Sequence, residues 1–337
     1  MKKLRIAQVS PLRLPVPDEK RGGNERIISY LTEELKKRGH KVTLFASADS
    51  KTNAKLISAK EKSLNNFIFD IDTIRWNIFN HSFAFEKASE FDIIHCHWDL
   101  MGAFFQKFVK TPVVNTSHYV ESPEKSVQKI YDYYKDKLNI IFISDKQKNN
   151  SKIKFKNNWV IQNGIPVSDF KFNAAPGDHL VWVGRMAPDK FAKEAIILAK
   201  KTRHKLLMAG QIEEYGREYF EKEIKPELNS EIQYVGELSY KELSNFYGSG
   251  KACLYPVGLA TLESLACGTP VIGLPNKKIN NKVGFSIQNI EQAVLAVKNI
   301  SEIRRKDCRN WVEQNFSIER MVDQYEEVYR QILKKQK

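Results

Sequence analysis

The stretch LYPVGLATLESLACGTPVIG, residues 254–273, decides the fold. Its first residues have the pattern of a strand, Gly258 opens a helix, Gly268 ends that helix, and a second strand begins at Pro270. A strand, a helix and a strand in this order form the unit of a parallel sheet covered by helices. Glu263 lies early in the predicted helix, where the helix dipole favours a negative charge.

The same alternation continues through the rest of the chain, with one interruption at the polar stretch PVSDFKFNAAPGDH, residues 166–179. Most predicted strands are continuous apolar runs, as expected when helices cover both faces of a parallel sheet. A chain of 337 residues also exceeds the size of most single cores. We therefore predict an α/β protein of two doubly wound, Rossmann-like domains that face each other across a cleft. The expected division is 1–168, 169–317 and a C-terminal helix, 318–337, that crosses back to the first domain.

Composition narrows the class of protein. No run of about 18 apolar residues could span a membrane, and the opening MKKLRIAQVSPLRLP reads as a first strand rather than a signal peptide. The four cysteines form no C-x-x-C pair, which favours a reduced, cytoplasmic protein; they are Cys96, Cys253, Cys267 and Cys308.

The formal net charge is +14, with dense basic patches in residues 125–137 and 145–158. Such patches attract a phosphorylated substrate, an anionic membrane surface or nucleic acid. A solvated, lysine-rich surface is the plainer interpretation, and we favour it. No nucleic-acid-binding signature accompanies the charge, so we expect no nucleic-acid partner. Peripheral contact with the inner face of the membrane stays open.

Two glycines follow the first predicted strand, in the motif RGGNERI. Gly22 and Gly23 would let the backbone approach a ligand, and the helix that follows would favour an anion at its N-terminus. The alternative is a plain turn in which Asn24 caps the helix and Glu25 complements the helix dipole.

Two cations follow the first strand of the second domain, in VGRMAPDK. Arg185 lies at the end of the strand and Lys190 after a short loop, so together they could clamp a pyrophosphate. An ordinary exposed loop is the alternative. At the helix start of the opening stretch, the N–H groups of Gly258, Leu259 and Ala260 would face a phosphate, while Glu263 would accept hydrogen bonds from ribose hydroxyls.

Histidines end two further strands. His118 is the last residue of PVVNTSH and is a candidate for function, although lone histidines are more often structural. His95 and His97 point to one side of a strand, but nothing nearby supplies a third ligand. We therefore predict no metal site and no other cofactor.

Taken in order, the motifs GGNER, GHKVTLFASADS, FDIIHCH, TSH, NGI, VGRMAPDK, GEL and TLESLACGTPVIG resemble the family 4 glycosyltransferases. The resemblance covers essentially the whole chain and is greatest to the subgroup typified by an avilamycin-biosynthesis glycosyltransferase. It implies the GT-B fold and a retaining, metal-independent transfer of a sugar from a nucleotide-diphosphate sugar. The expected acceptors are glycans, lipid-linked molecules or small molecules, as in polysaccharide biosynthesis.

The resemblance also implies roles at matching positions. His118 and Glu263 would be the catalytic pair, with His118 on the donor sugar and Glu263 on the ribose. Gly23 would approach the donor phosphate, and Leu238 would lie against the base. Arg185 and Lys190 would hold the diphosphate.

One position departs from the family pattern. Relatives place another glutamate eight positions before the one matched by Glu263, in a longer loop, and here that position is Tyr255. The shortened loop normally contacts the transferred sugar, so Tyr255, Asn276 and Lys277 are the nearest candidates to replace it. Two alternatives therefore remain beside the transferase: a non-catalytic nucleotide- or glycan-binding protein, and a GT-B nucleotide-sugar epimerase or hydrolase.

Overall fold

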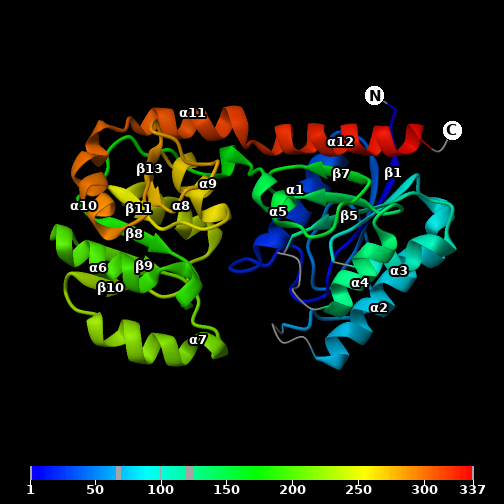
Figure 1. The fold of residues 1–337 in the computed structure, drawn as a ribbon, viewed down its shortest axis with the longest axis horizontal. Helices are drawn as coiled ribbons and strands as arrows, with labels where there is room; N and C mark the ends of the chain where they lie inside the picture. Colours follow the sequence, from blue (N-terminus) through cyan, green and yellow to red (C-terminus); the bar gives the residue numbers. More distant parts are fainter. Residues whose placement is uncertain (1, 66–69, 99, 119–124, 336–337) are drawn as a thin grey trace. The chain divides into compact units, whose positions relative to one another are not determined.

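The chain folds into two compact units (Figure 1). The structure, a computed structural model, describes residues 2–65, 70–98, 100–118 and 125–335. Unit 1 consists of residues 1–164 and 318–337, and unit 2 of residues 165–317. The boundary precedes the predicted 168/169 because the N–H of Ile165 donates to the Phe316 carbonyl at 2.9 Å, and Ile165 forms a β-bridge with Ser317. These contacts attach residues 165–169 to unit 2.

Unit 1 is built on a parallel sheet in the order β3-β2-β1-β4-β5-β6-β7. The central strands are almost wholly buried, as expected where helices cover both faces of a parallel sheet, and they carry polar residues such as Gln8 and His95 among the apolar ones. The strands are β1 (Arg5–Val9), β2 (Lys41–Phe45), β3 (Lys55–Ile57), β4 (Ile93–Cys96), β5 (Val113–Ser117), β6 (Asn139–Phe142) and β7 (Asn157–Val160).

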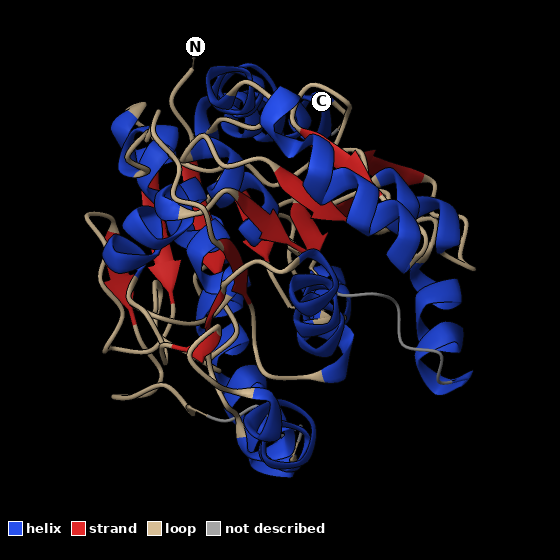
Figure 2. Ribbon diagram, turned by 90° about the vertical axis from the view of Figure 1, so that its left-hand side faces the viewer, coloured by secondary structure: helices blue, strands red, loops and turns tan. Residues whose placement is uncertain are grey.

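Helices surround the strands of the fold (Figure 2). A side-chain N-cap marks the start of the second helix: Asp70 accepts a hydrogen bond from the N–H of Thr73 at 2.7 Å. The helices are α1 (Gly23–Lys37), α2 (Ile71–Glu86), α3 (Met101–Phe105), α4 (Lys125–Tyr134), α5 (Asp145–Asn150) and α12 (Ile318–Lys334).

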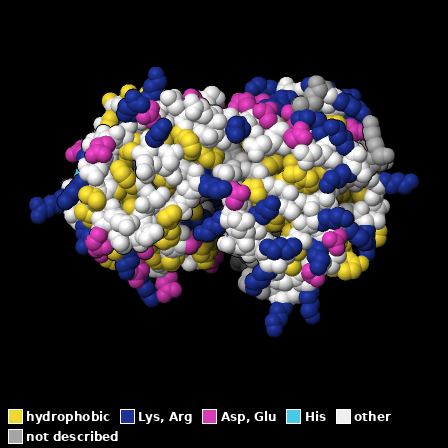
Figure 3. Space-filling view, turned by 45° about the horizontal axis from the view of Figure 1, so that its top comes forward, with side chains coloured by type: hydrophobic (Ala, Val, Ile, Leu, Met, Phe, Trp, Pro, Cys, Tyr) yellow, Lys and Arg dark blue, Asp and Glu magenta, His cyan; other side chains and the backbone are white. Residues whose placement is uncertain are grey.

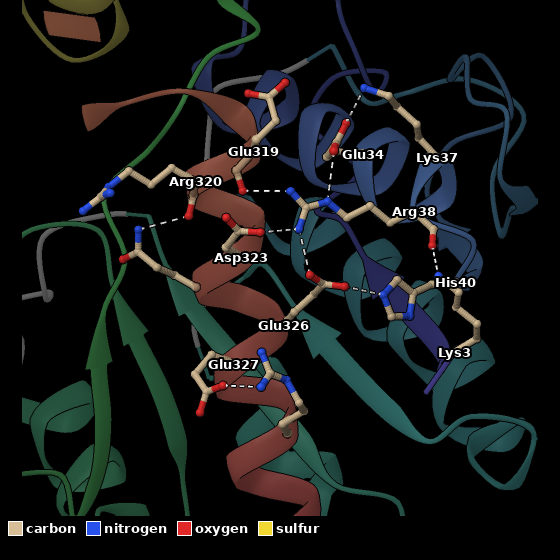
Figure 4. A network of polar contacts seen from close by, with 12 residues as sticks. Lys3, Glu34, Lys37, Arg38, His40, Glu319, Arg320, Asp323, Glu326 and Glu327 are labelled. Atoms are coloured by element: carbon tan, nitrogen blue, oxygen red, sulfur yellow. Dashed lines mark hydrogen bonds and ion pairs between the residues drawn. The ribbon is translucent and has the colours of Figure 1, made fainter. Parts of the chain in front are cut away.

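Helix α12 ends the chain yet packs in unit 1, against α1. One side of α12 is apolar and buried, including Met321, Val322 and Tyr325. A polar network also joins α12 to the end of α1 (Figure 4): Arg38 donates to Glu326 at 2.7 Å and to Asp323 at 2.6 Å. The last helix is therefore an integral part of the first unit.

Unit 2 has a second parallel sheet, in the order β10-β9-β8-β11-β12-β13. The strands are β8 (Leu180–Val183), β9 (Leu206–Ala209), β10 (Ile232–Tyr234), β11 (Ala252–Leu254), β12 (Val271–Gly273) and β13 (Gly284–Ser286). The helices are α6 (Ala192–Thr202), α7 (Glu214–Tyr219), α8 (Tyr240–Ser249), α9 (Leu259–Ala266), α10 (Ile290–Asn299) and α11 (Arg305–Asn315). As predicted, residues 254–273 contain the end of one strand, β11, then a helix, α9, and a second strand, β12.

The charged side chains lie on the surface with both signs mixed. Lysines and arginines are spread over the face in Figure 3, with acidic side chains between them. The four cysteines are buried and free. No helix in the described part of the chain is long and apolar enough to cross a membrane.

Candidate functional site

Each sheet reverses its strand order at one point. In unit 2, β8 pairs with β9 on one side and with β11 on the other, and all pairs are parallel. In unit 1, β1 lies in the same way between β2 and β4. The loops after the two central strands part in opposite directions at such a point, and ligands of open α/β sheets bind there.

The predicted cations of unit 2 lie beside its switch point, in the loop after β8. The guanidinium of Arg185 donates to the hydroxyl of Tyr215 and lies 3.6 Å from the buried carboxylate of Glu213. Lys190 pairs with Asp189 at 2.9 Å, and Arg185 lies 4.0 Å from the same carboxylate. The structure therefore brings both predicted cations together.

Close packing of backbone holds this loop. A Cβ on Gly210, after β9, would lie 1.8 Å from the carbonyl oxygen of Gly184, so the loops after β8 and β9 touch through their main chains. The buried indole of Trp182 donates to the carbonyl of Lys190 at 2.9 Å and fixes the return of the loop. Such a rigid edge keeps Arg185 and Lys190 in place for a ligand.

On the other side of the switch point, α9 starts directly after β11. Gly258 is exposed, has a left-handed φ of 70°, and leaves open space where a Cβ would be. Leu259 is buried and Ala260 half-buried, and both belong to the first turn of the helix. Glu263 is buried in the next turn and accepts from the hydroxyl of Tyr247 at 3.2 Å. The predicted helix start is thus formed, and Tyr247 orients its carboxylate.

A third cation that the sequence analysis missed lies at this helix start. Lys278, five residues beyond the glycine-ended strand β12, donates from Nζ to the Gly258 carbonyl at 2.9 Å. Burial lowers the pKa of Lys278 to about 8, against the opposing effect of Glu263. The sequence predicts its neighbours as candidates for the sugar contact, but Lys277 is exposed and Asn276 donates to the Leu274 carbonyl at 3.0 Å. Only the contact across the loop could have distinguished Lys278 from Lys277.

Tyr255, which takes the place of the family's first glutamate, is buried and stacks on Phe191, with ring centroids 5.8 Å apart. Both residues have left-handed backbones, with φ of 45° and 62°. Such angles are costly for aromatic residues. Tyr255 lies in the short turn between β11 and α9, and Phe191 is the N-cap of α6. An aromatic pair therefore fills the place where relatives carry a carboxylate. Leu238 lies half-buried after β10, beyond Gly236, at the same edge of the sheet.

In unit 1, the glycine pair opens α1. Gly22 caps the helix in a left-handed conformation with φ of 75°, and Gly23 is its exposed first residue. The alternative with Asn24 as cap is wrong, because the Gly22 carbonyl already accepts the first helical hydrogen bond, from Arg26. Glu25 does lie in the first turn, but buried, and burial raises the pKa of this carboxyl.

His118 ends β5 and belongs to a buried polar chain. Its Nε2 lies 3.0 Å from Nδ1 of His97, whose Nε2 lies 2.6 Å from the Gln8 carbonyl oxygen. The Gln8 amide also donates to the Tyr329 hydroxyl at 3.3 Å, and that hydroxyl lies 2.7 Å from Nδ1 of His95. Burial lowers the pKa of His118 to about 4, so the ring is neutral at pH 7. The structure thus divides the predicted residues between the two units.

No group of three or more histidine, cysteine, aspartate or glutamate side chains that could hold a metal is found among the described residues.

Comparison with known proteins decides the family. Residues 21–169 match the model of Glycosyltransferase Family 4, and residues 177–305 match that of Glycosyl transferases group 1. The chain belongs to glycosyltransferase family 4. The glycosyltransferase is 24% identical to the alpha-monoglucosyldiacylglycerol synthase of Streptococcus pneumoniae, over 76% of this chain and 68% of that protein.

Solved structures agree on the fold. The glycosyltransferase is similar to AviGT4, a glycosyltransferase involved in avilamycin A biosynthesis, with a TM-score of 0.73, 19% identity and 98% of each chain covered. It is also similar to Anabaena Alr3699/HepE in complex with UDP, with a TM-score of 0.74, 13% identity, and 97% and 100% covered. The predicted GT-B fold and family are confirmed, and the family matches support a nucleotide-sugar-dependent glycosyltransferase.

Proposed function

We propose that this glycosyltransferase takes its sugar from a nucleoside-diphosphate sugar whose diphosphate binds at the switch point of unit 2. The observation that carries the proposal is the set of positive groups on both sides of that point. Arg185 and Lys190 follow β8, while the α9 N-terminus and Lys278 follow β11 and β12, the next strands of the sheet. A phosphate at a helix N-terminus is stabilised by the dipole and by backbone N–H groups.

The nucleotide end of the donor would lie toward Glu263 and Leu238. A carboxylate that is oriented by Tyr247 can accept hydrogen bonds from both ribose hydroxyls, and Leu238 offers an apolar contact for the base. The similar Anabaena protein holds UDP. This supports a nucleoside diphosphate as the ligand class here, with uridine as the base to try before others.

We propose that transfer proceeds with retention and without a metal. The bond between the anomeric carbon and the diphosphate oxygen breaks, and the acceptor hydroxyl forms its bond from the same face. The departing diphosphate takes the acceptor's proton. Arg185, Lys190 and Lys278 stabilise the charge that grows on the diphosphate, which is the part a divalent cation plays elsewhere.

Calorimetry with UDP, ADP, GDP and dTDP tests the diphosphate site. Arg185→Ala should lower the affinity for the preferred diphosphate about tenfold or more, since a hydrogen bond to a charged group contributes about 1.5–3 kcal/mol. Lys201→Ala is the matched control, because it removes an exposed positive charge at the C-terminal end of α6, away from the switch point. Equal affinities of wild type and Arg185→Ala would refute the site.

The acceptor and the place of action are also proposals. Helix α4 carries Lys125 and Lys129 together with Tyr133, whose side chain is 70% exposed. Cations beside an exposed aromatic ring suit peripheral contact with an anionic membrane on the cytoplasmic side, and so a lipid-linked acceptor. Flotation with phosphatidylglycerol vesicles, but not with phosphatidylcholine vesicles, is the expected result. Equal recovery with both would favour a dissolved glycan or small-molecule acceptor.

A further inference from the structure

One buried nitrogen of unit 1 lies at the carboxyl end of β5, directly after the last residue of the strand. Nδ1 of His118 is shielded from solvent and has no hydrogen-bond partner within the described residues. The other ring nitrogen is engaged with His97. A buried polar atom without a partner is costly, so its presence at a strand end points to a ligand group that completes it.

Whether this nitrogen donates or accepts is fixed by the residues behind it. The Gln8 carbonyl oxygen faces Nε2 of His97, and an amide oxygen can only accept. His97 therefore carries its proton on Nε2 and presents a lone pair on Nδ1. Nε2 of His118 must then carry a proton to donate to His97, which leaves a lone pair on Nδ1 of His118.

The opposite end of Gln8 sets the amide orientation. The amide nitrogen donates to the hydroxyl of Tyr329 on α12, and that hydroxyl donates in turn to Nδ1 of His95. Nε2 of His95 then donates to the Thr116 hydroxyl at 2.7 Å, and Thr116 meets Tyr325 at 3.3 Å. Each bond between Gln8 and His118 therefore has one direction.

Rotating the Gln8 amide by 180° would reverse every bond and place a proton on Nδ1 of His118. That arrangement would bury an N–H without an acceptor, which proteins tolerate less often than an unpaired lone pair. The orientation in the structure avoids this cost.

We propose that Gln8 is a positioning residue of the glycosyltransferase: its amide fixes the tautomer of His118, through His97, so that His118 Nδ1 accepts a hydrogen bond from a hydroxyl of the donor sugar. The assignment of the sugar as partner rests on the proposed function, while the tautomer does not. Tyr329 supports Gln8 from α12, and so the last helix of the chain takes part in setting the state of a histidine at the edge of β5.

Nitrogen NMR of the full chain with ¹⁵N-labelled histidine tests the tautomer without any ligand. At pH 7 the Nδ1 resonance of His118, assigned by its loss in His118→Asn, should have the shift of an unprotonated nitrogen. Gln8→Met should shift it toward the average of both tautomers. Gln8→Glu should preserve it, because one carboxyl oxygen still accepts from His97. Tyr325→Phe is the control, since Tyr325 is the last member of this series of hydrogen bonds and His118 is the first.

A protonated Nδ1 in the wild type, or a Gln8→Met spectrum equal to the wild type, would overturn the proposal. If Gln8→Met does not fold, Tyr329→Phe provides the same comparison, since it removes the acceptor of the Gln8 amide.

Binding supplies the second measurement. Gln8→Met should weaken the preferred nucleotide sugar about threefold to tenfold, leave the bare diphosphate unchanged, and be rescued by Gln8→Glu. Equal loss for both ligands would contradict a contact with the sugar. If no nucleotide sugar binds the wild type, the proposed function fails and the sugar contact with it, whereas the tautomer result stands alone.

Discussion

Removing Glu326 should destabilise unit 1 far more than removing its neighbour Asp323, although Arg38 contacts both. The distances are nearly equal, 2.7 and 2.6 Å, but the Glu326 side chain is 6% exposed and that of Asp323 is 69% exposed. Glu326 also accepts from Nε2 of His40 at 2.7 Å, while Nδ1 of that ring accepts from the Leu4 N–H at 3.1 Å. Because Nδ1 accepts that N–H, a ring proton lies on Nε2, and this buried Nε2–H needs the carboxylate.

The magnitude follows from burial. Loss of one partner from a buried pair costs about 3–5 kcal/mol, and the lower end applies because Arg38 keeps Glu34 and Asp323. Asp323→Ala should cost about 0–1 kcal/mol, as exposed ion pairs do. For a unit of this size, about 3 kcal/mol corresponds to a fall in melting temperature of about 6–12 °C.

The pH dependence has a definite sign. Burial pushes the pKa of Glu326 upward, but hydrogen bonds from His40 and Arg38 outweigh it, and the folded-state pKa lies below the ordinary 4.5. The stabilisation is therefore fully present above about pH 4.5 and is lost as the pH falls through the lower, folded-state pKa.

Calorimetric scans and urea titrations of the two variants between pH 3 and 8 measure both effects. Hydrogen exchange of α12 amides assigns the transition to unit 1. If Glu326→Ala cost no more than Asp323→Ala at pH 7, burial would not be what gives this network its strength.

Three further predictions concern the diphosphate and its sugar. Because Lys278 loses its proton as the pH rises through about 8, the affinity of the wild type for the diphosphate, measured by calorimetry, should fall above that pH. Lys278→Met should bind the diphosphate about tenfold more weakly below pH 8 and show no fall in affinity above it. Lys278→Arg should bind the diphosphate with no fall in affinity above pH 8. EDTA should leave turnover intact, and recovery of a lost activity by Mg²⁺ or Mn²⁺ would contradict the metal-independent mechanism. With Tyr255 in place of a glutamate, a nucleotide sugar should bind little more tightly than its diphosphate, and a hundredfold advantage would show that another group clamps the sugar.

The strands and helices and the placement of the motifs on them could be predicted because they depend on local patterns. Residues 254–273 contain both strand runs, the left-handed glycine and the helix stop, and each feature appeared where the sequence predicted it. The GT-B fold follows from repeating that reasoning along the chain. The family match and the fold confirm it.

What could not be predicted depends on contacts between distant residues. Lys277 and Lys278 are equivalent in sequence, and only the fold of the loop after β12 turns Lys278 toward Gly258. His95 and His97 looked like an incomplete metal site, whereas the structure engages them with Tyr329 and Gln8, more than 200 and about 90 positions away. The site residues themselves stay predictions until a ligand is measured.

The placement of α12 has a consequence for synthesis on the ribosome. Unit 1 is interrupted by the whole of unit 2, so about 150 residues are made between β7 and the helix that completes the first unit. At about 5–20 residues per second, the nascent first unit waits about 8–30 s for its last helix. During that time Arg38, His40 and the apolar surface beneath α12 stay uncovered, and a chain stalled in unit 2 would present them to chaperones.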